Sequence, residues 1–240
     1  VAASAVDGVA AYGNAVGVPN IAGDLYFHPS FAGNCLVNVV ALGIVRADRI
    51  IHSRVPAGGA GYDLILVGKA TDASGFGGAA FASLVLDASE AHANKSAVQV
   101  PDPFLKSVIM RATYAVNREA FANKIPVGFK DLGAGGIMGS SSELCDAGGF
   151  GASIDLDAVP VAIDGLPPFV IACAETQERM LWAVPPAFTP AVLAIYNERF
   201  TLPDVAANAR AAVIGTVTSE RRYKLLAHGD AVCDLSLIHI

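Results

Sequence analysis

The chain has 240 residues, which suits one large or two small domains. Its residues are 53% hydrophobic and only 16% charged, a composition that indicates a buried globular core and excludes an intrinsically disordered chain. The formal net charge is −6 and no Lys- or Arg-rich run is present, so the sequence argues against nucleic-acid and membrane-surface partners.

The N-terminal part of the chain predicts a helix, two strands and a domain boundary. Residues 4–16 predict a helix with a serine N-cap and a glycine C-cap. The segments NIAGDLYF (20–27) and CLVNVVALGIV (35–45) are rich in β-branched residues and predict strands. The run RVPAGGAGYD (54–63) is the best candidate for a boundary, because glycines and a proline separate two apolar segments.

Beyond this boundary, strands and helices alternate. LILVG (64–68) predicts a buried strand that leads through a glycine-rich turn into a small-residue helix within residues 69–87. A long helix begins at Asp102 and Pro103. Its apolar positions fall on one face at helical spacing: Leu105, Val108, Ile109, Ala112 and Val116.

A second glycine-rich segment, KDLGAGGIMGSSSE (130–143), opens a helix that is predicted to end at Gly148 and Gly149. A further helix is predicted over residues 190–200. Strands are predicted at 169–174, 181–184, 211–217 and 223–227, the last of these being the final strand. This mixture indicates an α/β or α+β protein.

The cysteines predict a reducing environment. Four cysteines are widely spaced without a CxxC pair, so free thiols and a cytoplasmic location are expected. The histidines form no HxxxH or HExxH motif. The longest apolar run, residues 36–45, is too short to cross a membrane.

Both ends of the chain predict that it is a piece of a longer protein. It begins with Val1 rather than methionine, and its first residues lack the charged and apolar regions of a signal peptide. The last six residues, LSLIHI (235–240), follow a polar stretch and are either a strand or a non-native tail.

Three polar segments interrupt this hydrophobic chain, each beside a predicted buried strand: Asp72–Gly78, Asp131–Ser142 and Glu175–Glu178. Any one of them alone would be an ordinary turn. Three together, among so few charges, favour a binding site. Neither glycine-rich loop matches the dinucleotide fingerprint or the P-loop, so readings of those two kinds are weak.

The second polar segment suggests how a phosphate and an acid can share one loop. Backbone amides at Gly133, Gly135 and Gly136 are suited to hold an anion at a helix N-terminus. Asp131 would repel that anion unless a divalent cation lay between them, and magnesium takes one or two carboxylates together with phosphate oxygens. Asp131 is therefore either a magnesium ligand or a helix N-cap, and spacing alone leaves both open.

The third polar segment offers acceptors, a hydroxyl and an amide in Glu175, Thr176 and Gln177. Such groups suit recognition of a polar small molecule. The alternative is a tight polar turn between two hairpin strands. No Ser–His–Asp or Cys–His arrangement is indicated, so the residues identify no catalytic group.

Taken in order, several blocks of the chain resemble the synthetase (large) subunit of phosphoribosylformylglycinamidine synthase, an enzyme of purine biosynthesis. The resemblance runs from about Val6 to Asp234. It is carried by DGVAAYGNAVGVPNIAGD, NCLVNVVALGIV, LVGKATDASGFGGAAFASLVLD, VQVPDPF, KDLGAGGIMGSSSE, FGASIDLDAVP and AETQERM.

This resemblance implies a partial N-terminal sheet domain (1–54) followed by an aminoimidazole ribonucleotide synthetase-like C-terminal α/β domain (55–234). It implies an ATP- and magnesium-dependent carbon–nitrogen ligase that converts formylglycinamide ribonucleotide to formylglycinamidine ribonucleotide. ATP would activate the formylglycinamide oxygen as a phosphate ester, and ammonia from a glutaminase subunit would then displace the phosphate. A small accessory subunit is a further expected partner.

The resemblance also implies roles for particular residues. Gln99 in VQVPDP is similar to a substrate ligand, Asp131 to a magnesium ligand, and residues 175–177 to a substrate-binding strip. The family usually has serine where Thr176 stands. The family's ATP-contacting lysine and catalytic histidine would precede Val1, and its second domain pair would follow Ile240, so this chain alone is expected to be inactive.

Other assignments stay open. The loop KATDASGFGG departs from the commoner form with an Arg–Asp pair, so its contacts are not assigned. Another ATP-using relative, such as aminoimidazole ribonucleotide synthetase or selenophosphate synthetase, is an alternative, although the ETQERM and VQVPDPF blocks favour the first assignment. A non-catalytic half that binds a nucleotide or docks a partner is a third.

Overall fold

The computed structural model describes residues 2–32, 35–77 and 99–237. In these residues a seven-stranded sheet has the order β2-β4-β1-β5-β3-β6-β7, and paired strands run antiparallel except for the parallel pair β3 and β6. The strands are β1 Asp63–Gly68, β2 Gly128–Asp131, β3 Gly151–Asp155, β4 Arg179–Val184, β5 Arg210–Thr218, β6 Arg222–Ala227 and β7 Asp230–Ser236. The predicted mixed α/β class is confirmed.

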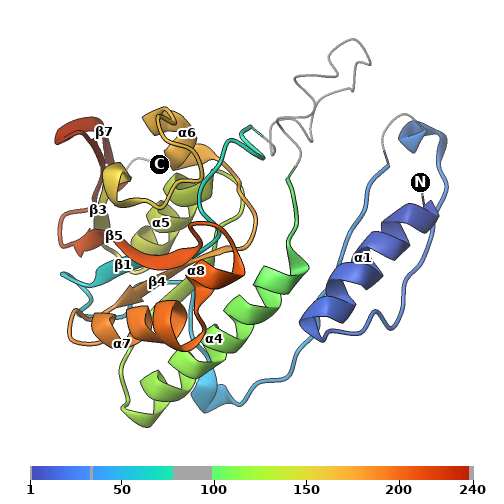
Figure 1. Cartoon of the computed structure of the whole chain (residues 1–240), viewed down its shortest axis with the longest axis horizontal. Coiled ribbons are helices and arrows are strands. Elements are labelled where there is room, and N and C mark those ends of the chain that lie inside the picture. The colour runs from blue at the N-terminus through green and yellow to red at the C-terminus, as the bar shows by residue number, and fades with distance from the viewer. Residues whose placement is uncertain (1, 33–34, 78–98, 238–240) are drawn as a thin grey trace.

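Helices cover both faces of this sheet (Figure 1). Side chains of a strand point alternately to its two faces, so Leu64 and Leu66 of β1 pack on one side and Ile65 and Val67 on the other. The first side is covered by α5 (Gly136–Asp146) and α6 (Pro168–Cys173). The second is covered by α4 (Pro103–Ala122), α7 (Thr189–Ala194), the π-helix η5 (Ile195–Arg199) and α8 (Leu202–Val205). Burial on both faces explains why β1 reads as a continuous apolar run.

The helix α4 forms as its sequence predicts. Asp102 caps it, since its Oδ1 accepts a hydrogen bond from the Leu105 amide at 2.9 Å. All five apolar positions of the predicted face are buried against the sheet. The predicted helix over 190–200 is also present, divided between α7 and η5.

A buried aromatic group joins these helices to the sheet. Trp182 of β4 is fully buried, and its ring centroid lies 4.2 Å from that of Phe129 in β2. Its indole Nε1 donates to Tyr196 Oη at 3.0 Å, and the same hydroxyl bonds Thr113 Oγ1 of α4 at 2.7 Å. The polar atoms of this group are therefore satisfied inside an apolar core.

Two predictions in the C-terminal part are wrong. Residues 169–174, expected as a strand, contain the helix α6, because Pro167 and Pro168 fix a helical start and a short apolar run does not distinguish strand from helix. The strand at 223–227 is not the last, because β7 follows it. His228 and Gly229 both adopt positive φ, as a two-residue hairpin turn requires. β7 includes Leu235 and Ser236, and Leu237 is buried.

The other strand predictions at 64–68, 181–184 and 211–217 are confirmed as parts of β1, β4 and β5. Strands β2 and β3 lie outside every predicted strand. The connecting segments that the structure describes include the short 3-10 helices η1 (Pro29–Phe31), η2 (Ala47–Arg49) and η4 (Leu156–Ala158). The small-residue helix predicted within 69–87 falls largely outside the described residues, which end at 77 before the gap.

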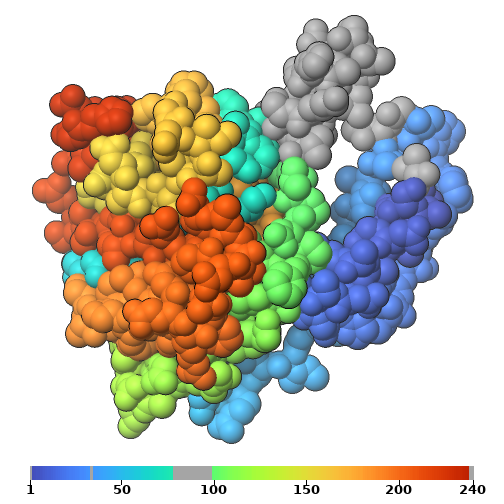
Figure 2. Space-filling model, in the orientation of Figure 1, coloured from blue at the N-terminus to red at the C-terminus, as the bar shows by residue number. Residues whose placement is uncertain are grey.

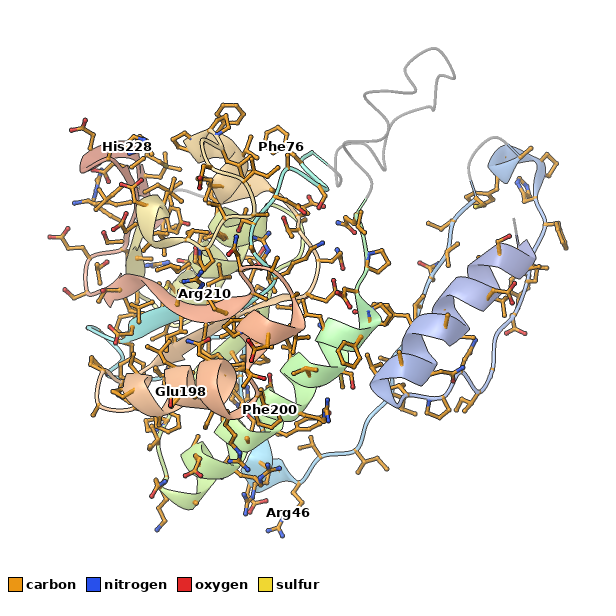
Figure 3. All side chains as sticks on the ribbon, in the orientation of Figure 1. Arg46, Phe76, Glu198, Phe200, Arg210 and His228 are labelled. Atoms are coloured by element: carbon orange, nitrogen blue, oxygen red, sulfur yellow. The ribbon has the colours of Figure 1, made fainter. Side chains whose placement is uncertain are left out.

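The N-terminal residues form a lobe beside this body (Figures 1 and 2). The predicted helix is present as α1 (Ala2–Val16), which packs along α4. The strands predicted at 20–27 and 35–45 are absent from their described residues, which are extended, unpaired and exposed. A strand needs a hydrogen-bonded neighbour, and within the described chain none lies alongside them. Arg46 lies where this lobe joins the α/β body (Figure 3).

The exposed side chains of this lobe lead us to expect self-association of the chain at micromolar concentration. Tyr26, Leu42 and Ile44 are 87%, 91% and 103% exposed, among other large apolar residues. Exposed apolar segments of extended backbone are interaction sites. The triple variant Tyr26→Ser, Leu42→Ser, Ile44→Ser should shift sedimentation velocity toward monomer without loss of folding.

Ile163→Ser is a suitable control, because Ile163 is 63% exposed on the α/β body. It should leave the sedimentation profile unchanged. A wild-type chain that sediments as monomer at all concentrations would show that these segments drive no association.

Candidate functional site

The sheet register brings the three polar segments together. In the antiparallel pair β1–β4, Gly68 lies opposite Arg179, and in the pair β2–β4, Asp131 lies opposite Met180. The loop after β1, the loop after β2 and the segment before β4 therefore leave the sheet at one end of three neighbouring strands. Segments that are separated by up to about a hundred residues in the sequence become a single site.

Glu175 is at the centre of this site. Its side chain is 6% exposed, and its Oε2 accepts a hydrogen bond from Gln99 Nε2 at 2.9 Å. Its Oε1 accepts a long bond from the Gly135 amide at 3.4 Å. The structure thus joins two residues of the predicted substrate group to the predicted phosphate loop.

The glycine loop is tightly packed. Gly135 is the N-cap of α5 with φ 73°, and Gly136 has φ 55°. A Cβ atom at Gly136 would lie 2.3 Å from the Ala174 carbonyl oxygen, so only glycine allows this approach of loop and strip. The Gly136 amide donates to the Gly133 carbonyl at 3.1 Å. Phosphate binding through Gly133, Gly135 and Gly136 stays a prediction, and an anion would have to compete with these two internal bonds.

Asp131 is the last residue of β2 and is exposed. The alternative in which it caps the following helix is wrong, because α5 begins at Gly136 and its N-cap is Gly135. Nearby, burial lowers the pKa of the half-buried Lys106, and the carboxylates of Glu178 and Asp131 oppose that effect. Asp131 thus lies exposed at the end of a strand.

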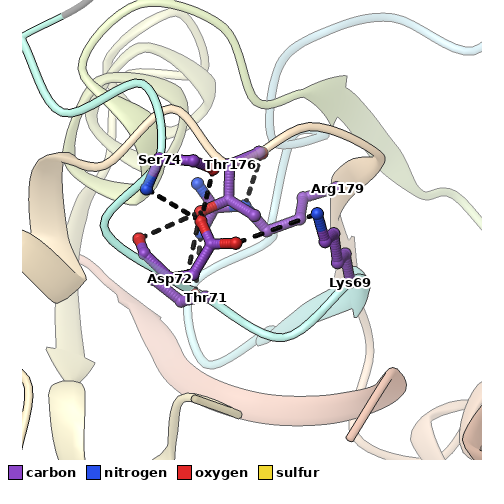
Figure 4. Close-up of polar contacts among 6 residues, drawn as sticks. All are labelled: Lys69, Thr71, Asp72, Ser74, Thr176 and Arg179. Atoms are coloured by element: carbon purple, nitrogen blue, oxygen red, sulfur yellow. Dashed lines mark hydrogen bonds and ion pairs between the residues drawn. The ribbon is translucent and has the colours of Figure 1, made fainter. Parts of the chain in front are cut away.

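The Thr176 hydroxyl is not open to solvent, as a substrate-binding group would be. It is fully buried, and its Oγ1 lies 2.9 Å from Asp72 Oδ1 and 3.2 Å from the Asp72 carbonyl oxygen (Figure 4). Thr176 Oγ1 also accepts a hydrogen bond from the Asp72 amide at 3.1 Å. Its neighbour Gln177 is half-buried. The hydroxyl therefore faces the loop after β1 rather than solvent.

Arg179 lies beneath this contact with 2% exposure. Its Nε donates to the Thr176 carbonyl and its Nη1 to Thr71 Oγ1, both at 2.9 Å, and its Nη2 donates to the Ala174 carbonyl (Figure 4). Burial lowers the pKa of Arg179 to about 10, and the charge of Asp72 opposes the shift. The guanidinium thus stays protonated at neutral pH and clamps the strip from both ends.

A hydrogen bond joins the site to the N-terminal lobe. Tyr12 Oη of α1 donates to Glu178 Oε1 at 2.6 Å. Glu178 is 3% exposed with φ 56°, and its Oε2 is buried without a hydrogen-bond partner in the described residues. The helix α1 thus supplies a hydrogen bond to this buried carboxylate.

Asp72, Arg179 and Glu178 were not assigned from the sequence, although Asp72 and Glu178 stand in the polar segments and Arg179 in the AETQERM block. A charged residue at the first position of an otherwise apolar strand was the available signal for Arg179. The alternative in which residues 175–178 join hairpin strands is wrong, since the preceding element is the helix α6.

The donor set fits a metal that is shared with a ligand rather than a closed protein cage. The described residues contain no group of three or more His, Cys, Asp or Glu side chains that could hold a metal ion. Magnesium is commonly held by one or two carboxylates and completed by substrate phosphates and water. An exposed Asp131 at a strand end fits that mode.

Three further features lie outside this site. A hollow of about 510 Å³ lies elsewhere, between the connecting residues 50–57, the C-terminal end of α4 and the end of α5, and contains none of the predicted site residues. All four cysteines are free, as predicted. In the described part of the chain, no helix combines the length and hydrophobicity needed to span a membrane.

The fold and site define an α/β domain that gathers a glycine loop and a buried glutamate, hydrogen-bonded to an exposed amide side chain, at one end of its sheet. This arrangement is suited to a polar small molecule. Comparison with protein families gives the particular class. Residues 59–228 match the family "AIR synthase related protein, C-terminal domain", and the chain belongs to this family.

Among curated relatives, the "Phosphoribosylformylglycinamidine synthase subunit PurL" of Methanothrix thermoacetophila is 50% identical over 242 residues, which cover 100% of this chain and 31% of that protein. The chain thus spans about a third of this relative's length.

The Thermotoga maritima structures are similar over nearly the whole chain. "T. maritima PurL complexed with FGAR" has a TM-score of 0.82 and 33% identity, covering 98% of this chain and 36% of that one. "T. maritima PurL complexed with ATP" has 0.75 and 29%, with 97% and 34% covered. "Structure of PurLQS from Thermotoga maritima" has 0.76 and 30%, with the same coverage.

Proposed function

We propose that this chain is part of an ATP-dependent ligase subunit that converts formylglycinamide ribonucleotide to formylglycinamidine ribonucleotide in purine biosynthesis. The observation that carries the proposal is the cluster of Gln99, Glu175 and Gly135, which assembles predicted substrate and phosphate groups from three distant segments. The similarity to a relative solved with FGAR and with ATP supports it.

The residues have distinct chemical roles in this proposal. Gln99 and Gln177 offer amide donors and acceptors to the polar groups of the ribonucleotide, and Glu175 holds Gln99 in place through its carboxylate. Glu175 is buried, Gln177 is half-buried and Gln99 is exposed, so a fixed carboxylate orients amide groups that a ligand can reach. Preorganisation of this kind lowers the cost of ordering the site on binding.

Asp131 would hold a magnesium ion together with phosphate oxygens. When bound, the ion supplies charge neutralisation for the phosphate that activates the substrate amide oxygen. Asp131 contributes the negative charge that retains the cation.

Residues 1–54 would be the end of an N-terminal sheet domain and residues 55–234 the C-terminal domain of the subunit. The catalytic base and the ATP-contacting lysine would come from outside this chain. Ammonia would arrive from a glutaminase subunit with a small accessory subunit, a proposal supported by the similarity to PurLQS. Free thiols at all four cysteines support a cytoplasmic location.

The test uses the complete protein that contains this chain, with formylglycinamide ribonucleotide, ATP, magnesium and ammonium. We expect formation of formylglycinamidine ribonucleotide and ADP by the complete protein and none by the isolated 240-residue chain, because half a site does not position the reactants. If the complete protein instead consumed formylglycinamidine ribonucleotide or selenide as its ATP-dependent substrate, it would have the activity of another superfamily member. That result would overturn the proposal.

A further inference from the structure

The loop after β1 is fastened to the candidate strip through one hydroxyl. Thr176 Oγ1 meets the side chain, the amide and the carbonyl of Asp72, three contacts between residues that are 104 positions apart. The Ser74 amide donates a hydrogen bond to Asp72 Oδ1 at 2.9 Å, and the Ser74 hydroxyl donates to the same carboxylate oxygen. Asp72 therefore closes the loop and anchors it to the strip (Figure 4).

This anchor stands on a fixed base. Arg179 holds the carbonyls on either side of Glu175, those of Ala174 and Thr176, and also holds Thr71 next to Asp72. Thr71 is in turn bonded through its own backbone to Pro160 and Ala162, both at 2.8 Å. The two ends of the Asp72–Thr176 contact are thus tied to the same buried guanidinium.

The fastened loop forms a wall against the candidate ligand residues. A Cβ atom at Gly75 would lie 2.9 Å from Gln99 Cγ and 3.0 Å from Glu175 Cβ, so the loop backbone is in direct contact with both. Phe76 continues this wall, and its ring lies 5.7 Å from that of Phe169 in α6. Any shift of the loop changes the space around Gln99 and Glu175.

We propose that Asp72 is a positioning residue for substrate binding, which through Thr176 fixes the loop of residues 71–77 against Gln99 and Glu175. The expected effect of Asp72 on ribonucleotide binding rests on the proposed function. It also revises the part of Thr176, whose hydroxyl positions the strip through Asp72 instead of contacting the substrate.

The charge of Asp72 is suited to a contact inside the protein. Burial opposes ionisation, but hydrogen bonds from Ser74 and Thr176 and the charge of Lys69 outweigh it, so the pKa of Asp72 lies below its ordinary value. Lys69 Nζ lies 3.8 Å from Asp72 Oδ2, with both side chains about a quarter exposed. The carboxylate is already surrounded by donors of its own chain.

The first measurement is hydrogen exchange of the segments 71–77 and 174–178, which needs no ligand. Asp72→Ala and Thr176→Val should each speed exchange there about tenfold, equivalent to about 1.4 kcal/mol of local stability. Thr176→Ser keeps the hydroxyl and should exchange as wild type. Unchanged exchange in both Asp72→Ala and Thr176→Val would overturn the positioning role.

The second measurement is a double-mutant cycle in the complete protein. Asp72→Ala and Thr176→Val should each raise KM for formylglycinamide ribonucleotide about tenfold with kcat within about twofold. The double variant should lose clearly less than the product of the two single effects, because the contact between Thr176 Oγ1 and Asp72 Oδ1 is lost in all three variants. Asp72→Asn, which keeps an acceptor oxygen, should restore most of the affinity.

Multiplying effects in the double variant would show that Thr176 contacts the substrate independently, and loss in Asp72→Asn equal to that in Asp72→Ala would show a direct role of the charge. Either result overturns the proposal. A wild-type protein that does not turn over the ribonucleotide refutes the proposed function instead, and exchange then decides the positioning role.

A matched control is available at the other end of β1. Thr189 Oγ1 donates to Asp63 Oδ2 at 2.6 Å, a Thr–Asp contact of the same chemistry away from the site. Asp63→Ala should leave KM and the exchange of residues 174–178 unchanged. An equal effect of Asp63→Ala would assign the Asp72 result to general loss of stability and overturn the positioning role.

Discussion

Asp131→Asn is expected to reduce magnesium-dependent turnover of the complete protein by at least roughly 10–100-fold, the range seen when only outer-shell partners of a metal are changed. Folding should hardly respond. The side chain is exposed at the end of β2 and caps no helix, and surface substitutions of this kind stay within about 0.5 kcal/mol. Steady-state kinetics across a magnesium titration, beside urea unfolding, separate the two effects.

Asp146→Asn is the control for this change, because Asp146 is an exposed acid at the end of α5 that pairs with Arg221. Its turnover should stay within about twofold of wild type, as for an exposed surface pair. If Asp131→Asn also retains wild-type turnover and magnesium dependence, Asp131 is not a metal ligand.

Arg179→Met is expected to lower the free energy of unfolding by about 3 kcal/mol, more than most single substitutions. Three acceptors lose their donor at once: the carbonyls of Ala174 and Thr176 and the hydroxyl of Thr71. Each buried group left unsatisfied costs about 1–3 kcal/mol. Relief from burying a charge offsets part of this loss, which is why the expected value is at the low end of the sum.

Two further variants identify the cause in a urea unfolding experiment. Arg179→Lys keeps the charge but lacks the planar fork of donors, so it should recover only part of the stability. Arg210→Met removes the same charge from an exposed position (Figure 3) and should change the free energy of unfolding by less than about 0.5 kcal/mol. Wild-type stability in Arg179→Met would mean that these bonds contribute nothing net.

Helices with a clear periodicity could be predicted from the sequence, and the comparison with the structure shows why some strands could not. Residues 105–116 repeat at helical spacing, so α4 follows from local pattern alone. Residues 35–45 have the composition of a strand, but pairing is a property of the neighbouring backbone, and the described chain supplies no neighbour. The run 169–174 fails for another reason, since a short apolar segment has no readable period.

For the site, residue types could be predicted more reliably than their partners. The family resemblance assigns Gln99 and Glu175 to one substrate-binding group, and in the structure Gln99 Nε2 lies 2.9 Å from Glu175 Oε2. The contact of Thr176 with Asp72 could not be derived, because it depends on the register that sets Gly68 opposite Arg179. Sheet register over a separation of more than a hundred residues is not encoded in any local pattern.

The chain has one tryptophan, and its position makes it a built-in spectroscopic reporter. Trp182 stands on β4 only three residues after Arg179, sealed between Phe129 and Tyr196. Its emission should be blue-shifted in the native state and should move to the red when β4 leaves the sheet. Intrinsic fluorescence therefore follows the strand that comes directly after the candidate strip, and stopped-flow or quenching experiments need no added dye.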